Sequence, residues 1–241
     1  MQYHYNIMNI KIFADGSDIK EIFDLYENNK LVKGFTTNPS LMKKAGVTNY
    51  EAFIKEVTSK IKDLSISFEV FADDHDGMLY QAEKIASFGE NVYVKIPITN
   101  TKGEYTTPVI QKLIDKKIKI NVTAIFTNDQ IYELKNLPND NVYENMIISV
   151  FAGRIADTGR NPMNKINFAV YNRRTNTDIL WASTREIYNI YQAEESGCDI
   201  ITASTDQIKK FSILQNKNLT EYSLETVKMF YDDAKSSGLS L

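Results

Sequence analysis

The sequence predicts a single α/β domain, a (β/α)8 barrel over residues 1–241 with a C-terminal helical extension over residues 221–241. Two observations support this class. Short apolar runs alternate with amphipathic segments along the whole chain, and eight such runs in 241 residues match the size and repeat number of this barrel. A doubly wound open sheet is the alternative, but the first run is followed by Asp15–Asp18 (DGSD), which is no glycine-rich phosphate loop.

Eight runs are predicted as strands because they are short, apolar and mostly β-branched, as expected for strands buried on both faces of a parallel sheet. In chain order they are Ile10–Ala14, Val32–Thr36, Ile66–Phe71, Val92–Ile98, Ile118–Phe126, Met146–Phe151, Ile179–Ala182 and Asp199–Ala203.

Amphipathic segments between these runs are predicted as helices, because apolar residues recur in them with a period near 3.6. They are Asp18–Tyr26, Tyr50–Ile61, Met78–Phe88, Val109–Lys116 and Glu186–Glu195. Gly197 follows the last of them as a helix stop signal.

A further helix is predicted over Ser223–Lys235, after the eighth strand, with Ser223 as its N-cap. Its wide apolar face includes Leu224, Val227, Phe230 and Tyr231, and a barrel of eight repeats does not require it. Because large exposed apolar surfaces usually mark contacts, we expect the helix to mediate assembly into a homo-oligomer. The alternative is a helix that folds back over its own barrel.

Composition and charge narrow the choice of partners. The net charge is −3, which gives no general attraction to nucleic acid or to anionic membranes. The single cysteine, Cys198, excludes an internal disulfide and is expected in the core. The first residues contain no apolar core of a signal peptide, so we expect a cytoplasmic protein.

Nearly every predicted strand carries polar groups near its carboxyl end, where the active sites of these barrels lie. The groups are Asp15, Thr36, Thr37, Asn38, Glu69, Lys95, Asn121, Thr123, Ser149, Arg154, Ser183 and Arg185. A buried polar group without a partner costs about 1–3 kcal/mol, so this accumulation indicates a functional site.

Lys95 is the most informative of these residues, because it lies inside the apolar run VYVKIPI. Desolvation favours the neutral amine, the form that attacks a ketone carbonyl to make an imine. Asp15 and Glu69 provide carboxylates for proton transfer. The structural alternatives are an edge-strand lysine or an ion pair of Lys95 with Glu69, and an N-cap role for Asp15, although Ser17 and Asp18 lie nearer the helix.

Arg154 and Arg185 follow the sixth and seventh strands, where the loops of such barrels often bind phosphate. Surface ion pairs with Asp157 or Glu186 are the alternative. The run Asp73–Asp76 (DDHD) superficially resembles a metal site, but consecutive residues cannot all face one ion and helix capping explains them. No metal is predicted.

Seven segments make the chain similar to the transaldolase family. They are FADGSDI (Phe13–Ile19), GFTTNPSL (Gly34–Leu41), FEVFA (Phe68–Ala72), VKIPIT (Val94–Thr99), INVTAIF (Ile120–Phe126), SVFAGRI (Ser149–Ile155) and WASTRE (Trp181–Glu186). The resemblance implies a (β/α)8 barrel that acts on sugar phosphates through a Schiff-base lysine, without metal or organic cofactor. Small members of the family commonly form rings in which the C-terminal helix packs on a neighbour.

The resemblance also implies a role for each matching residue. It implies that Lys95 forms the imine, that Asp15 transfers a proton, and that Glu69 and Thr123 hold the catalytic water. The residues implied to hydrogen-bond the sugar and the carbinolamine are Asn38, Asn121 and Ser149. The residues implied to bind the phosphate are Arg154, Ser183 and Arg185.

Two positions place the chain on the transaldolase branch of this family. The related fructose 6-phosphate aldolases carry Gln at the position of Glu69 and Tyr at the position of Phe151, which here is an apolar residue of the substrate site. Minor departures are Val150, Ala152 and the insert Asp157–Thr177.

Overall fold

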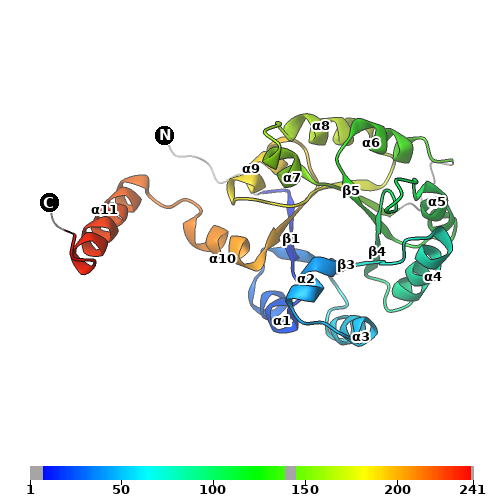
Figure 1. Ribbon diagram of the computed structural model, residues 1–241, viewed down its shortest axis with the longest axis horizontal. Coiled ribbons are helices and arrows are strands. Elements are labelled where there is room, and N and C mark those ends of the chain that lie inside the picture. The colour runs from blue at the N-terminus through cyan, green and yellow to red at the C-terminus, as the bar shows by residue number, and fades with distance from the viewer. Residues whose placement is uncertain (1–7, 139–144, 240–241) are drawn as a thin grey trace.

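The computed structural model describes residues 8–138 and 145–239, which form a closed barrel of eight parallel strands surrounded by helices (Figure 1). The strands pair in chain order, and β8 closes the barrel against β1. They are β1 (Lys11–Asp15), β2 (Val32–Thr36), β3 (Ser65–Glu69), β4 (Val92–Pro97), β5 (Ile120–Ile125), β6 (Met146–Val150), β7 (Thr177–Trp181) and β8 (Ile200–Ser204). The predicted fold class is confirmed.

Alternation along the strands divides the apolar residues into two cores. A small cluster comprises Phe13, Ile147, Leu180, Ala182 and Ile200. A much larger cluster takes the alternate positions on the same strands, such as Ile12 and Ile148, and joins them to the helices. Gly34 is required beside the small cluster, because a Cβ there would lie 2.6 Å from the Phe13 ring.

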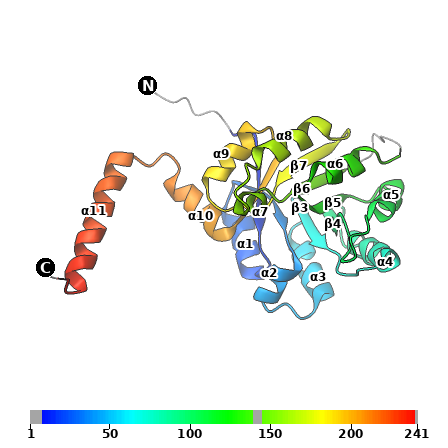
Figure 2. The same ribbon diagram turned by 45° about the horizontal axis from the view of Figure 1, so that its top comes forward.

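Helices cover the outside of the barrel, as Figures 1 and 2 show. They are α1 (Ile19–Asn28), α2 (Pro39–Lys44), α3 (Tyr50–Lys60), α4 (His75–Ala86), α5 (Thr107–Asp115), α6 (Asn128–Lys135), α7 (Ala152–Asp157), α8 (Met163–Asn172), α9 (Tyr188–Glu195) and α10 (Thr205–Leu214). Gly197 follows α9 with φ of +77°, which agrees with its predicted role as a stop signal.

The third strand and the number of helices in the sequence prediction need correction. The third strand ends at Glu69 rather than at Phe71, and the Phe71 side chain is 66% exposed in the loop that follows. Five helices were not predicted, namely α2, α6, α7, α8 and α10. Two of these, α2 and α7, have only six residues each, too short for a helical period to be recognised.

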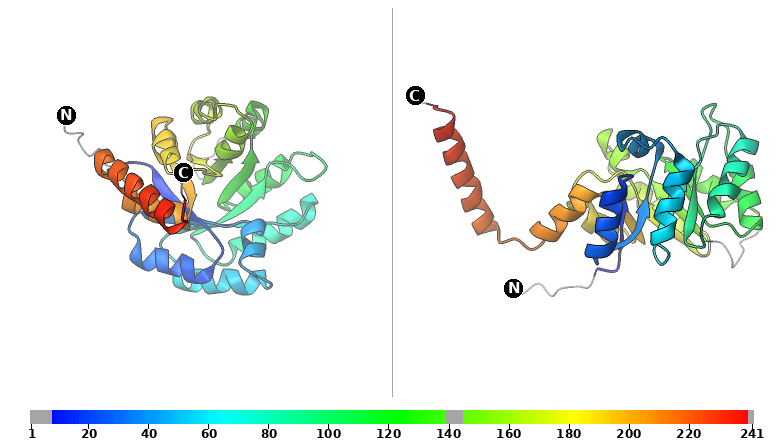
Figure 3. Two further views of the ribbon diagram at one scale, coloured as in Figure 1. Left: turned by 60° about the vertical axis from the view of Figure 1, so that its left-hand side comes forward. Right: turned by 90° about the horizontal axis from the view of Figure 1, so that it is seen from below.

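The C-terminal helix α11 (Leu219–Ser236) lies away from the barrel in Figures 1 and 2 and in the right-hand view of Figure 3. It begins one turn earlier than predicted, because the side chain of Asn218, and not that of Ser223, caps its first turn. None of its residues is buried, so it does not fold back over its own barrel. In the described part of the chain, no helix combines the length and apolarity needed to cross a membrane.

Candidate active site

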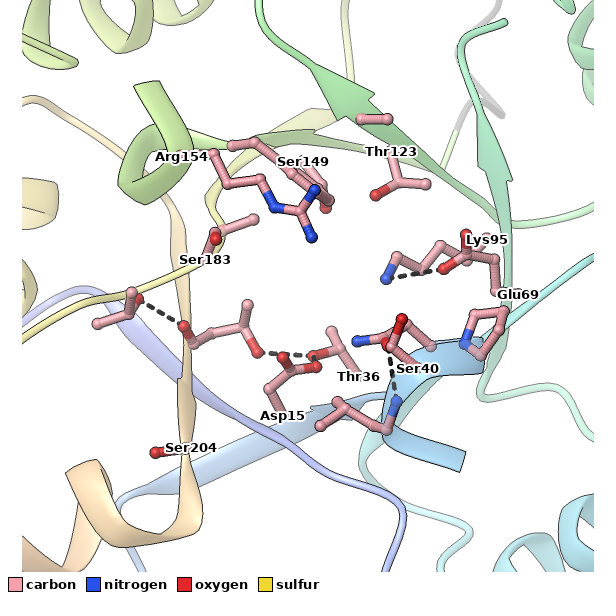
Figure 4. Close-up of a pocket in the computed structure, with 18 of the residues that line it drawn as sticks. Asp15, Thr36, Ser40, Glu69, Lys95, Thr123, Ser149, Arg154, Ser183 and Ser204 are labelled. Atoms are coloured by element: carbon pink, nitrogen blue, oxygen red, sulfur yellow. Dashed lines mark hydrogen bonds and ion pairs between the residues drawn. The ribbon is translucent and has the colours of Figure 1, made fainter. Parts of the chain in front are cut away.

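A cavity of about 530 Å³ opens at the carboxyl ends of the strands (Figure 4). Eleven of the residues singled out in the sequence line it: Asp15, Thr36, Asn38, Glu69, Lys95, Thr123, Ser149, Phe151, Arg154, Ser183 and Arg185. The fold therefore brings residues from most of the strands to one place, as expected for the site face of this barrel.

Lys95 and Glu69 form an ion pair inside the barrel. They occupy paired positions on β3 and β4, and the Lys95 Nζ lies 3.1 Å from Oε2 of Glu69. Nζ also donates a hydrogen bond of 3.0 Å to the backbone oxygen of Thr37. The ion-pair alternative for Lys95 is therefore observed, and it leaves the amine facing the cavity beside a carboxylate that can accept its proton.

Asp15 ends β1 and is free from helix capping, because Asp18 caps α1 through hydrogen bonds from Lys20 N and Glu21 N. Oδ1 of Asp15 accepts a hydrogen bond of 2.8 Å from Thr36. Burial raises the pKa of Asp15, while the Lys95 charge and the Thr36 hydrogen bond act against that rise. A carboxylate with a raised pKa is suited to take up and return a proton.

Asn121 lies outside the cavity lining and supports it through two hydroxyls. Ser149 Oγ donates a hydrogen bond of 2.7 Å to Asn121 Oδ1, and Asn121 Nδ2 donates one of 3.0 Å to Ser67 Oγ. All three side chains are buried. Asn121 therefore orients Ser149 in this structure, and its direct contact with substrate stays a prediction.

Thr123 is placed by a bulge in β5. Val122 and Ile125 of β5 pair with Ile148 and Val150 of β6. Between these two pairs β5 has two residues and β6 has one, so β5 contains one extra residue. Ala124 there has φ of +61°, a conformation that is unfavourable for a side chain with a Cβ. The Thr123 hydroxyl is buried and has no hydrogen-bond partner within the described residues, which leaves it available to a bound water or substrate.

Arg154 and Phe151 form one part of the rim. Arg154 points into the cavity in Figure 4, and its guanidinium carbon lies 5.4 Å from the centre of the Phe151 ring. Across residues 8–138 and 145–239 the Arg154 side chain makes no hydrogen bond or ion pair. Its donors are free for an anionic ligand.

Arg185, by contrast, is already engaged. Its Nε and Nη2 bond the two Asp157 carboxylate oxygens at 2.9 and 2.5 Å, which lowers the pKa of Asp157. Nη1 donates to the backbone oxygen and hydroxyl of Ser183 at 2.9 and 3.0 Å. The Ser183 loop approaches α7 so closely that a Cβ on Gly153 would lie 1.6 Å from the Ser183 carbonyl oxygen. The surface-pair alternative for Arg185 is thus observed.

Asn38 has a local structural role in addition to its place in the cavity. Its Oδ1 caps α2 by accepting a hydrogen bond of 3.0 Å from Leu41 N, and Pro39 fills the first helical position. The amide nitrogen of the Asn38 side chain donates to no described residue and is available to a ligand.

Two cavity residues on β8, Thr202 and Ser204, were missed at the sequence level. They stand two residues apart in an apolar strand, and this alternation was the available signal. The acidic run Asp73–Asp76 spans the start of α4, and Asp74 caps this helix by accepting a hydrogen bond from Gly77 N. Within the described ranges no cluster of three or more His, Cys, Asp or Glu residues could hold a metal ion.

Fold and site together define a (β/α)8 protein with a lysine–carboxylate pair deep in its cavity and arginines at the rim. Residues 12–241 match the model of the Transaldolase/Fructose-6-phosphate aldolase family, and the chain belongs to that family. Membership makes it an enzyme of the transaldolase/aldolase type.

Curated relatives of similar length support this membership. A probable transaldolase from Methanococcus vannielii is 33% identical over 221 residues, which cover 90% of this chain and 94% of the relative. A probable transaldolase from Geobacter metallireducens is 37% identical over 196 residues, covering 80% and 86%.

Solved structures that share the fold are more distant in sequence. 3-Hexulose-6-phosphate synthase from Salmonella typhimurium superposes with a TM-score of 0.59 at 14% identity, covering 86% of this chain and all of that one. Dihydrodipicolinate synthase from Rhodopseudomonas palustris gives a TM-score of 0.55 at 12% identity, covering 90% and 79%. At these identities the likeness shows the fold alone.

Proposed function

We propose that the protein is a transaldolase, which transfers a dihydroxyacetone unit from a ketose phosphate to an aldose phosphate through a Schiff base on Lys95. Fructose 6-phosphate and sedoheptulose 7-phosphate are the proposed donors. The observation that carries this proposal is the buried Lys95 Nζ, 3.1 Å from Glu69 and in one cavity with Asp15 and Arg154.

The first half of the reaction forms the imine. Glu69 takes a proton from the Lys95 ammonium, and the neutral amine attacks C2 of the ketose to give a carbinolamine. Loss of water from the carbinolamine then yields the protonated imine. The Thr123 hydroxyl, which no described residue hydrogen-bonds, faces the same cavity and holds the water that carries these protons.

The second half breaks and remakes a carbon–carbon bond. Asp15 removes the proton of the C4 hydroxyl, the C3–C4 bond breaks, and its electron pair passes into the protonated imine to give an enamine on Lys95. The aldose phosphate leaves. An acceptor aldose phosphate then binds, its aldehyde carbon is attacked by the enamine, and the steps run in reverse. The apolar Phe151 beside the site limits water that would hydrolyse the intermediate.

Retention of the three-carbon unit separates a transaldolase from an aldolase that releases free dihydroxyacetone. Glu69 and Phe151 favour the transaldolase. A coupled assay with fructose 6-phosphate tests this choice. We expect turnover only when an acceptor such as erythrose 4-phosphate is present. Equal release of glyceraldehyde 3-phosphate without an acceptor would identify an aldolase, and no turnover in either arm would indicate a barrel that only binds sugar phosphates.

We further propose that α11 packs on a second copy of the chain. Leu224, Val227, Phe230 and Tyr231 are 54–66% exposed on a helix with no buried residue. A free apolar surface of this kind is unfavourable in water. Light scattering of the full chain and of a chain ending at Asn218 tests the proposal: a discrete oligomer should be lost on truncation, and a monomeric full chain at micromolar concentration would contradict it.

The proposal includes a cytoplasmic location and a place in the pentose phosphate pathway. The single cysteine supports the location, because Cys198 is a free and buried thiol whose pKa burial raises to about 12. Such a protein has no need of an oxidising compartment.

A further inference from the structure

Two threonines beside Asp15 have no role in the mechanism above. Thr36 ends β2 and is paired in register with Asp15, while Thr202 lies on β8, on the other side of β1. Both side chains line the cavity wall and are buried, at 2% and 5% exposure. Figure 4 shows Thr36 directed at Asp15.

The two hydroxyls form a chain that ends on one oxygen of Asp15. Thr36 Oγ1 lies 2.8 Å from Asp15 Oδ1 and 2.6 Å from Thr202 Oγ1. An ionised carboxylate only accepts hydrogen bonds, so the single hydroxyl proton of Thr36 is directed to Asp15. The short contact between the threonines then requires the proton of Thr202. The order of donation is Thr202 to Thr36 to Asp15.

This order makes the two carboxylate oxygens of Asp15 unequal. Oδ1 is held by Thr36, whereas Oδ2 accepts no hydrogen bond from any described residue. A hydroxyl that also accepts a hydrogen bond becomes a stronger donor, so Thr202 strengthens the bond from Thr36. The backbone oxygen of Thr202 in turn accepts a hydrogen bond of 2.7 Å from Thr184, which fixes this part of β8.

We propose that Thr36 and Thr202 are positioning residues that present Oδ2 of Asp15 to the substrate hydroxyl and keep the carboxylate ionised between turnovers. The inference rests on the proposed function, because it assigns the pair to the proton transfer that accompanies C3–C4 cleavage. Neither threonine touches the reacting atoms in this account.

The test separates carbon–carbon cleavage from imine formation. Thr36→Val, Thr36→Ser, Thr202→Val and the control Thr58→Val are compared with the unaltered chain. Thr58 makes one buried hydrogen bond in α3, remote from the cavity. Each variant is assayed for transfer from fructose 6-phosphate, and for borohydride trapping of dihydroxyacetone on Lys95, which needs no bond cleavage.

We expect kcat to fall roughly 30–100-fold in Thr36→Val and roughly 3–10-fold in Thr202→Val. Both losses are smaller than, or at most equal to, the low end of the roughly 10²–10⁴-fold that a general base contributes, because Asp15 itself is retained. KM should change less than about twofold, Thr36→Ser should recover most of the rate, and trapping should match the unaltered chain. The hydrogen bond from Thr36 stabilises the ionised form of Asp15, so its loss in Thr36→Val should raise the pKa of Asp15. The acid limb of the kcat/KM profile should therefore move to higher pH in this variant. Lys95, Glu69, Arg154 and Arg185 are the other charged groups of this cavity and are unchanged in every variant.

Three results would overturn the inference: an unchanged kcat in Thr36→Val, an equal loss in Thr36→Ser, or a loss confined to KM. Loss of trapping together with turnover would show that the threonines merely support the barrel. An unaltered chain that traps no dihydroxyacetone at all would overturn the proposed function, and this inference with it.

Discussion

The deep end of the cavity and its rim are built by different means. At the deep end, Lys95 and Glu69 are 8% and 17% exposed and project from paired positions on adjacent strands. At the rim, Arg185 and Asp157 are 44% and 51% exposed and come from a loop and a short helix. The barrel register therefore fixes the proposed reacting groups, whereas the groups proposed to bind phosphate are side chains at the surface.

This contrast predicts that substitutions at the deep end stop the chemistry, while those at the rim change affinity. Replacing Lys95 by Met should have the largest effect. We expect transfer to fall at least about 10⁴-fold, the scale seen when a covalent nucleophile is removed. Far-ultraviolet circular dichroism should show an intact barrel, because Met retains the length and apolar stem of the side chain. Residual transfer above one percent would contradict the assignment.

Asp15→Asn should separate activity from stability. Without its proton acceptor the enzyme should lose about 10²–10⁴-fold in kcat. Burial raises the pKa of Asp15, so the folded chain binds the carboxyl proton more tightly than the unfolded chain. The free energy of unfolding therefore decreases as pH rises from the pKa of the unfolded chain to that of the folded chain. At neutral pH the uncharged amide introduced by Asp15→Asn would avoid the cost of burying an ionised carboxylate at this position.

The melting temperature of Asp15→Asn should therefore exceed that of the unaltered chain at neutral pH. A gain of 1 kcal/mol corresponds to about 2–4 °C for a chain of this length. The difference should shrink as pH falls toward about 3.9, the ordinary pKa of aspartate. Calorimetry across this range checks the sign, and a lower melting temperature of the variant at neutral pH would contradict it.

Arg154→Ala should weaken binding rather than chemistry. Its guanidinium is free to meet a phosphate, so its loss should cost roughly 2–3 kcal/mol, or about 30- to 160-fold in KM for fructose 6-phosphate. Trapping of unphosphorylated dihydroxyacetone should stay within about twofold. Equal losses with both compounds would show that the arginine has a structural role instead.

Asp157→Asn should have the smallest effect on KM for fructose 6-phosphate, and it should lower KM rather than raise it. The carboxylate occupies two donors of Arg185 and places a negative charge near the proposed phosphate site. Its neutralisation should lower KM for fructose 6-phosphate by about two- to fivefold at low ionic strength, less at high salt. A higher KM would show that Asp157 instead holds Arg185 in the binding geometry.

The same contrast explains how far the sequence could be interpreted. Periodicity and strand composition were sufficient to predict the barrel. Lys95 was indicated by its place inside an apolar run, and Asp15 and Glu69 by their places near the carboxyl ends of strands, which parallel strands bring to one face. The bulge at Ala124 left no such signal, since it depends on the pairing of β5 with β6. The Asn218 cap likewise arises from local geometry that the helical period does not encode, whereas the Arg185–Asp157 pair was one of the two alternatives that the sequence left open.

Borohydride reduction in the presence of fructose 6-phosphate, followed by mass mapping of the peptides, is the most direct test of the proposed Schiff base. We expect one modified peptide, with a three-carbon fragment on Lys95 and no label on other lysines. Label on a different lysine, or none under conditions that support transfer, would contradict a Schiff base on Lys95.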